Sequence, residues 1–269
     1  MPMPPSDPRR LTPRSPASPA PARELEQRLI GVNACLAAFA RRPQDLRKLW
    51  LAERQRELRT MLAWCVRQRI GYRVVAAEEI AKLSGSDHHE GVCCAFLRAP
   101  ALNLDALLHD LRAGPALLLW LEGVGNPHNL GALLRSGAHF GIAGVLLAPD
   151  SELTLSPAAL RIAEGGAEAV PVLRLEQREA ALAQLRGAGF ALAATTPHRA
   201  QSVYAAKLPA RMLLWLGAEG AGLPATLQDA ADLRLSIPGS GAVESLNVSA
   251  AAAVLCSEWY RRHVAVAPV

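Results

Sequence analysis

The sequence predicts an α/β protein made of two units, a small one before residue 100 and a larger one from residue 116 onward. Short apolar runs of strand length alternate along the chain with segments whose apolar side chains recur every three or four residues, as they do in helices. The chain has 269 residues, and 51% of them are hydrophobic, which is enough to form two cores.

Residues 1–22 precede the small unit and are rich in Pro, Ser, Ala and Arg. Such a composition buries too little apolar surface to offset the entropy lost on ordering. We therefore expect a disordered tail over residues 1–22 and a folded unit over residues 23–99.

Strand and helix patterns alternate through this small unit. The helical pattern over residues 54–69 is the clearest, because Leu58, Leu62 and Cys65 fall on one face. In chain order, the predicted elements are a helix over 34–40, a strand over 46–51, a helix over 54–69, a strand over 72–76, a helix over 78–83 and a strand over 91–97.

Positive charge is concentrated in the same unit. Ten arginines and lysines stand between residues 41 and 73 against three acidic residues, while the whole chain carries a formal charge of +5. A basic cluster of this kind can bind phosphates, although a solvated helix face would look similar. We favour nucleic acid as the partner. Sequence-specific reading of duplex DNA is disfavoured, since the sequence has no helix-turn-helix or zinc-finger pattern.

Residues 100–115 are predicted to be a linker with a short helix, and residues 116–269 to form the second unit. A strand followed by a helix and another strand, repeated several times, predicts a mostly parallel sheet. The predicted strands are 116–122, 144–148, 170–173, 191–195, 212–216 and 233–237, and the predicted helices are 130–140, 158–163, 176–186, 225–230 and 248–262.

Three glycine-rich or polar loops follow strands of this second unit, at the sheet edge where ligands bind in open parallel sheets. The first loop contains Asn129, expected to cap the next helix, and is followed by Arg135, which suits a phosphate. The second has three glycines around Glu219 but lacks the dinucleotide spacing G-x-G-x-x-G. The third places Ser240 between glycines without the G-x-S-x-G pattern, which excludes a serine hydrolase.

Together the three loops resemble the signature motifs of the SpoU (TrmH-like) family of RNA methyltransferases, in the SPOUT superfamily. The motifs are N-L-G-x-x-x-R at 129–135, L-G-x-E-G-x-G-L at 216–223 and I-P-x-x-G-x-V-E-S-L-N-V-S-x-A at 237–251. The resemblance covers about residues 116–262. Residues 29–97 resemble the L30e-like RNA-binding domain of part of the family, and the stretches 34–43 and 83–91 resemble its YfiF-like branch.

The resemblance implies a SPOUT domain with a deep trefoil knot that dimerises through its C-terminal segment. It also implies methyl transfer from S-adenosyl-L-methionine to a ribose 2′-hydroxyl of rRNA or tRNA. By motif position, the expected cofactor-binding residues are Gly217, Ile237 and Leu246. The expected catalytic residues are Asn129, Arg135, Glu219, Ser245 and Asn247.

The family resemblance also suggests a role for each catalytic residue. Arg135 would fix an RNA phosphate that relays the proton of the hydroxyl. Asn129 and Asn247 would orient backbone and ribose, Glu219 would hold Arg135 or its own loop, and Ser245 would contact substrate or cofactor. Three positions depart from the family pattern and bear on the substrate rather than the reaction: Glu164, Ala218 and Gly239.

Two other classes of function remain open. An RNA-binding pseudoenzyme would keep the fold without turnover, but the presence of all five expected catalytic residues argues against it. A metal-dependent hydrolase would need more than His88 and His89, since adjacent histidines point in different directions and no third ligand is suitably spaced. We therefore expect no metal.

The five cysteines are odd in number and include no C-x-x-C pair, which favours buried free thiols in a reducing compartment. No stretch has the length and apolarity of a membrane span, and the start of the chain lacks the apolar core of a signal peptide. We expect a soluble cytoplasmic homodimer. In the last helix, Val254, Leu255 and Trp259 lie on one side and residues 250–253 are alanines that permit close approach of a second copy.

Overall fold

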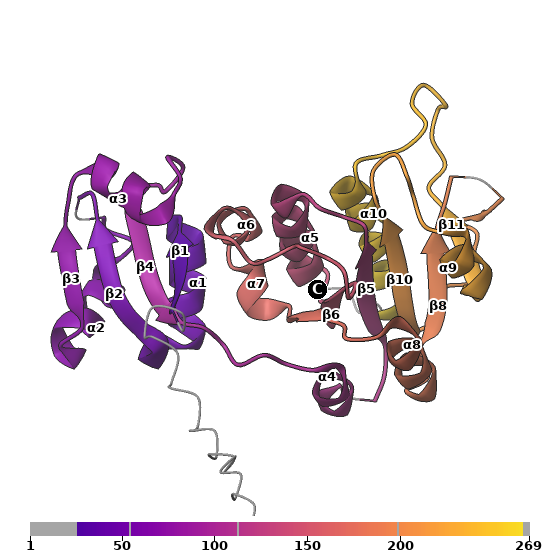
Figure 1. The fold of residues 1–269 in the computed structure, drawn as a ribbon, viewed down its shortest axis with the longest axis horizontal. Coiled ribbons are helices and arrows are strands. Elements are labelled where there is room, and N and C mark those ends of the chain that lie inside the picture. The colour runs from indigo at the N-terminus through magenta and orange to yellow at the C-terminus, as the bar shows by residue number, and fades with distance from the viewer. Residues whose placement is uncertain (1–25, 54, 112, 198, 266–269) are drawn as a thin grey trace, which may run out of the picture.

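The structure is a computed structural model of the chain, and it describes residues 26–53, 55–111, 113–197 and 199–265. The two units lie side by side and are joined by a segment that includes helix α4 (Leu104–Asp110) (Figure 1). The tail predicted over residues 1–22 lies outside the described residues. Within those residues, no helix combines the length and apolarity that crossing a membrane requires.

The small unit is a four-stranded mixed sheet with three α-helices. Its strands lie in the order β1-β4-β2-β3, with β4 antiparallel to both of its neighbours and β2 parallel to β3. The strands are β1 (Glu26–Ile30), β2 (Leu46–Leu51), β3 (Gly71–Val74) and β4 (Val92–Leu97). The helices are α1 (Val32–Arg41), the 3-10 turn η1 (Pro43–Asp45), α2 (Arg59–Gln68) and α3 (Ala77–Ser84).

Two features of the small unit differ from the sequence-based prediction. Strand β1 was missed, because its first three residues are polar and only Leu29 and Ile30 are buried. Helix α2 begins at Arg59 rather than at residue 54, because the preceding charged stretch offers no apolar side chain to the core before Leu58. The unit is anchored by β4, five of whose six residues are buried.

The large unit is built on a seven-stranded sheet in which every strand pairing is parallel, which confirms the predicted mostly parallel α/β fold. Its order is β7-β6-β5-β10-β8-β11-β9. The strands are β5 (Ala116–Glu122), β6 (Gly144–Leu147), β7 (Val172–Arg174), β8 (Ala191–Thr195), β9 (Gln201–Ser202), β10 (Arg211–Gly217) and β11 (Leu233–Ser236).

Helices cover both faces of this sheet. Alternate residues of β5 point to opposite sides: Leu117 joins one core, and Trp120 joins the other. The first core is closed by α5 (Pro127–His139) and α10 (Val248–His263), and the second by α4, α8 (Arg178–Gly187) and α9 (Ala225–Ala230). Two short helices, α6 (Pro157–Ala163) and α7 (Gly166–Ala169), lie between α5 and the small unit (Figure 1).

The small unit is fixed to α6 and α7 by side chains that are almost fully buried. Arg42 donates from Nε and Nη2 to the two carboxylate oxygens of Glu168, at 2.8 and 2.7 Å. Leu160 of α6 packs into the small unit's core, and a Cβ added to Gly165 would lie 2.3 Å from the Cβ of Ala37. The bidentate ion pair, the apolar contact of Leu160 and the close packing of Gly165 against Ala37 together fix the orientation of the two units.

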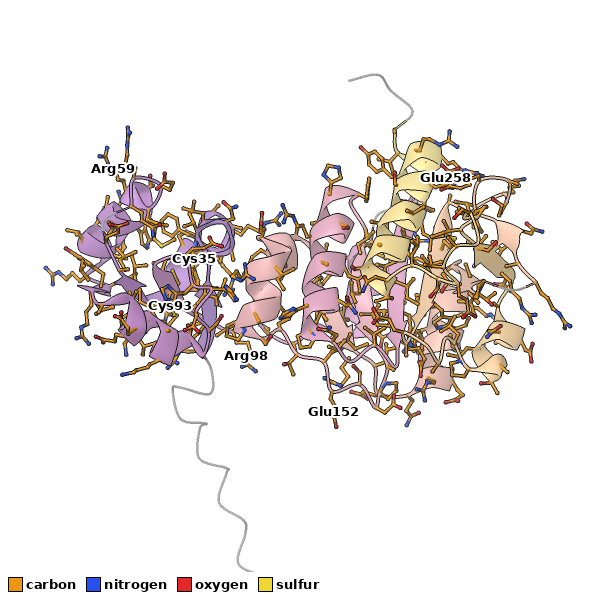
Figure 2. The ribbon with its side chains drawn as sticks, turned by 90° about the horizontal axis from the view of Figure 1, so that it is seen from above. Cys35, Arg59, Cys93, Arg98, Glu152 and Glu258 are labelled. Atoms are coloured by element: carbon orange, nitrogen blue, oxygen red, sulfur yellow. The ribbon has the colours of Figure 1, made fainter. Side chains whose placement is uncertain are left out.

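The last helix is held in place by charge as well as by its apolar face. The carboxylate of Glu258, which Figure 2 labels on this helix, accepts hydrogen bonds from Arg261 and Arg262. Arg262 also donates to the carbonyl oxygens of Val203 and Tyr204 at 3.0 and 2.7 Å. The Trp259 indole donates to the Pro209 carbonyl at 3.1 Å. These contacts tie α10 to the segment between β9 and β10.

The expectation that Leu255 and Trp259 face a second copy is wrong. Both side chains are buried in the core between α10 and the sheet of the same chain. Val254 is half-buried, and the alanine at position 250 is exposed. All five cysteines are buried and free, as predicted, and burial raises the pKa of the Cys256 thiol to about 12.

The ion pairs of Glu258 predict a specific pH dependence of stability. The hydrogen bond from Arg261 is the largest cause that lowers the pKa of Glu258 from 4.5 to about 2, with Arg262 acting in the same direction against burial. The carboxylate therefore stabilises the fold fully above pH 4.5, and this stabilisation is lost as the pH falls toward 2. Urea unfolding should show wild type more stable than Glu258→Gln at neutral pH, with a difference that shrinks over this range. A difference independent of pH would contradict this account.

Candidate active site

The three loops singled out in the sequence meet at one edge of the parallel sheet. Strand β5 is paired with β10 along its whole length, and β8 lies between β10 and β11. The loops that follow β5, β10 and β11 therefore leave the sheet on the same side. The third loop, residues 237–247, is the longest of the three and projects beyond the sheet before α10 begins (Figure 1).

A cluster of three polar side chains joins these loops, and we call it the Glu219 cluster. The amide nitrogens of Asn129 and Asn247 donate to the same Oε1 of Glu219, at 3.0 and 2.7 Å. Asn247 also donates to Oδ1 of Asn129 at 3.0 Å. Each residue belongs to a different motif, so the structure brings three of the five expected catalytic residues into contact.

The helix caps next to the cluster differ in part from the prediction. Asn126, not Asn129, caps α5: its Oδ1 accepts from the backbone N–H of His128 at 2.9 Å, and Pro127 occupies the first helical position. Asn129 therefore lies within the first turn, where its side chain is available to Glu219. Asn247 caps α10, accepting from the backbone N–H of Ser249 at 2.9 Å.

Arg135 lies apart from this cluster within one chain. It is six residues beyond Asn129 on α5, which places it about 9 Å farther along the axis and about 120° around the helix. Its Nη1 donates to Oε1 of Glu164 at 2.8 Å, and the other oxygen of Glu164 accepts from Asn33 of the small unit at 3.4 Å. Glu219 thus holds its own loop and the two asparagines, and Arg135 is held by Glu164.

The Arg135–Glu164 pair is open to solvent, with side-chain exposures of 60% and 39%. An exposed pair of this kind contributes only about 0–1 kcal/mol. Glu164 itself ends α6 in the left-handed region, at φ 45°. The sequence marked Glu164 only as a departure, and nothing local could show that its partners are Asn33 and Arg135.

The cofactor-binding residues expected from the motifs line the second and third loops. Gly217 is required by the close turn after β10: an added Cβ would lie 2.4–2.6 Å from backbone atoms of Gly222 and Leu223. Ile237 is half-buried against the core, and Leu246 is exposed on the projecting loop. Ser245 is exposed, and the described residues give its hydroxyl no hydrogen-bond partner. Apolar side chains and exposed glycine-turn backbone are both groups that suit a flat heteroaromatic ring.

A second carboxylate ends β5 at this edge but is fully engaged. Glu122 accepts from the Trp120 indole at 3.1 Å and from Arg178 at 2.5 Å, and Arg178 also pairs with Asp150 at 3.0 Å. The hydrogen bond from Glu122 is the main cause that raises the pKa of Arg178. This network holds β5 against α8 and leaves Glu219 as the carboxylate in contact with the two motif asparagines.

Gly131 serves packing within the protein. A Cβ there would lie 2.6 Å from the carbonyl oxygen of Ala159, so the glycine allows α5 and α6 to touch. No group of three or more metal-ligating side chains occurs among the described residues.

The chain is similar in sequence to known RNA methyltransferases. Residues 116–257 match the SpoU rRNA Methylase family, and residues 28–100 match the family described as RNA 2'-O ribose methyltransferase substrate binding. The chain is 38% identical, over 90% of its length and 70% of the relative's, to the uncharacterized tRNA/rRNA methyltransferase YfiF of Escherichia coli O157:H7. It is 33% identical, over 88% of its length and 96% of the relative's, to the 23S rRNA (guanosine-2'-O-)-methyltransferase RlmB of Ralstonia nicotianae.

The fold is shared with a solved structure. The SpoU methyltransferase AviRb from Streptomyces viridochromogenes, in complex with the cofactor AdoMet, matches with a TM-score of 0.74 at 23% identity. The match covers 89% of this chain and 91% of that one, so both units are included.

The close turn after β10 predicts that Gly217→Ala is destabilising. The new methyl group would meet fixed backbone, so we expect a loss of about 1–3 kcal/mol in the free energy of unfolding, measured by urea titration. Gly187→Ala is the matched control, because nothing lies within 4 Å of its added Cβ and its φ is not positive. That variant should be neutral or slightly stabilised. Equal stability of the two variants would contradict the contact assigned to Gly217.

Proposed function

Because this chain belongs to the SpoU rRNA methylase family, we propose that it transfers the methyl group of S-adenosyl-L-methionine to a ribose 2′-hydroxyl of rRNA or tRNA. The observation that carries the proposal is the Glu219 cluster, in which residues of all three motifs are hydrogen-bonded at the carboxyl edge of the sheet. The 23S rRNA methyltransferases among the relatives support the choice of RNA and of the ribose oxygen. The trefoil knot implied by the resemblance stays a prediction.

The residues present fit the cofactor. Gly217 lies in a close turn of glycine-rich backbone, and Ile237 and Leu246 of the third loop offer apolar side chains to an adenine ring. When bound, the cofactor supplies a methyl group on a positively charged sulfur. The chain must then align the ribose oxygen with that methyl group and accept the hydroxyl proton.

Arg135 contributes by binding a phosphate. A guanidinium stays protonated in proteins, so Arg135 is not a simple base. Its planar fork suits an RNA phosphate next to the reacting ribose, and that phosphate can accept the proton while Arg135 fixes it. Asn129 and Asn247 have fixed orientations because Glu219 accepts from both, and they position the ribose and the backbone around it.

A second copy of the chain is needed to complete this site. Within one chain Arg135 faces Glu164 and the small unit, whereas Asn129 faces the loops. In a two-fold dimer, the same helix α5 of the partner can present Arg135 to the Glu219 cluster. The exposed side chain of Val243 is available for the contact. We infer a homodimer with shared active sites, acting in the cytoplasm, where its buried thiols stay reduced.

The first test of the proposal is methyl transfer to RNA by wild type and by Arg135→Ala. We expect the substitution to lower turnover by about 100-fold or more while cofactor affinity, measured by calorimetry, stays unchanged. Arg135→Lys should not restore turnover, because it keeps the charge and loses the fork. Arg186→Ala is the control, because it removes an exposed arginine on α8, away from the three loops.

The product should resist alkaline cleavage at the modified linkage. A methyl group on a base would refute the proposed reaction, and RNA binding without any methyl transfer would indicate a pseudoenzyme.

The shared site predicts complementation between two inactive variants. Arg135→Ala and Asn247→Ala should each be inactive as homodimers. If they are co-refolded, heterodimers contain one site with both wild-type residues, so about a quarter of wild-type activity should return. If each chain built its own site, the mixture would stay inactive.

A further inference from the structure

A hollow on the small unit lies between helix α2 and strand β3. Its volume is about 400 Å³, within the range of roughly 300–1,000 Å³ seen for pockets that hold small organic ligands. One wall is the face of α2 that carries Arg59, Leu62 and Val66, three and four residues apart. The other wall is the face of β3 that carries Tyr72 and Val74, two residues apart.

The apolar lining of this hollow is open to solvent. Val66 is 64% exposed, Tyr72 40% and Val74 54%. Among the described residues of the small unit, these three are the large apolar side chains that are exposed, and all of them line the hollow. Scattered exposed apolar residues are normal, but their concentration in one place marks a binding surface.

Positive charge stands at the same place. Arg56 and Arg59 line the hollow, and no carboxylate of the described residues lies within ion-pair distance of either guanidinium. Figure 2 shows Arg59 projecting outward from the small unit. Strand β3 is also the edge strand of its sheet, with β2 as its one neighbour among the described strands.

This combination favours one kind of occupant. An aromatic ring flanked by aliphatic side chains offers a stacking surface to a nucleobase, and guanidinium groups beside it suit the adjoining phosphates. A base within a duplex is stacked on its neighbours and is not available to such a surface. An apolar peptide would bring Arg56 and Arg59 no partner for their charge.

We propose that this hollow binds an unpaired nucleotide of the RNA substrate, with its base on Tyr72 between Val66 and Val74 and neighbouring phosphates on Arg56 and Arg59. The inference rests on the proposed function, which makes RNA the substrate, and adds where and in what form the small unit holds it. It gives the RNA a second attachment point away from the Glu219 cluster, so the two contacts act together on one strand.

The test is the affinity of the full-length protein for a fluorescein-labelled oligouridine of about a dozen nucleotides. Tyr72→Ala should weaken binding by about 5- to 100-fold, as the loss of one base–aromatic stack does, and Tyr72→Phe should restore it. Tyr204→Ala is the matched control, because Tyr204 is exposed on the large unit. Arg59→Ala should weaken binding and reduce its salt dependence, whereas Tyr72→Ala should leave the salt dependence unchanged.

Competition with a blunt-ended RNA duplex of equal phosphate number separates stacking from charge, since wild type and Tyr72→Ala should bind the duplex with similar affinity. Unchanged oligouridine binding by Tyr72→Ala would overturn the inference. A Val66→Asp variant that changes the oligomeric state in light scattering without changing RNA affinity would overturn it as well, and would assign the hollow to a contact between copies. Either of these results would leave the proposed function intact as long as the wild-type protein transfers methyl groups to RNA. Absence of methyl transfer by the wild-type protein would refute the proposed function separately.

Discussion

The hydrogen bonds to Glu219 are the constraint on which the candidate site depends. Three loops that are separate in the sequence leave the sheet at the same edge, and loops of this length have many conformations available to them. A single carboxylate oxygen that accepts from Asn129 and Asn247 selects a conformation in which the three loops are joined. Gly217 makes this possible, because it lets the chain after β10 turn sharply enough to bring Glu219 toward α5.

Helix α5 carries this constraint to the rest of the molecule. Its first turn supplies Asn129, and its next two turns pack against α6 and α7 through contacts that only glycine permits. An added Cβ at Gly166 would lie 2.5 Å from the carbonyl oxygen of Leu134. Since α7 also holds Arg42 through Glu168, the orientation of the small unit and the position of the site are set by the same helix. If RNA binds to the small unit as proposed, it is thereby held at a defined distance from the Glu219 cluster.

The sequence predicted most of the elements because their hydrophobic patterns are local. Strand β5 and helix α9 both have the predicted bounds. The parallel sheet follows from the alternation of strands and helices along the chain. What the sequence did not show depends on contacts between distant segments. The partner of Arg135 is 29 residues away, and the link from Glu164 to Asn33 spans 131 residues. The burial of Trp259 within its own chain was also missed, because an apolar helix face does not reveal which surface it meets.

The contact between Arg135 and Glu164 has a consequence for how RNA reaches the site. One oxygen of the Glu164 carboxylate accepts from Nη1 of Arg135, so Glu164 engages a donor that the proposed phosphate would need. The pair is exposed and therefore weak, which allows exchange when RNA arrives. Asn33 of the small unit donates to the same carboxylate, so Glu164 stays near Arg135 after the exchange and can pair with it again. Glu164, a position where the sequence departs from the family pattern, thus links Arg135 of the large unit to Asn33 of the small unit.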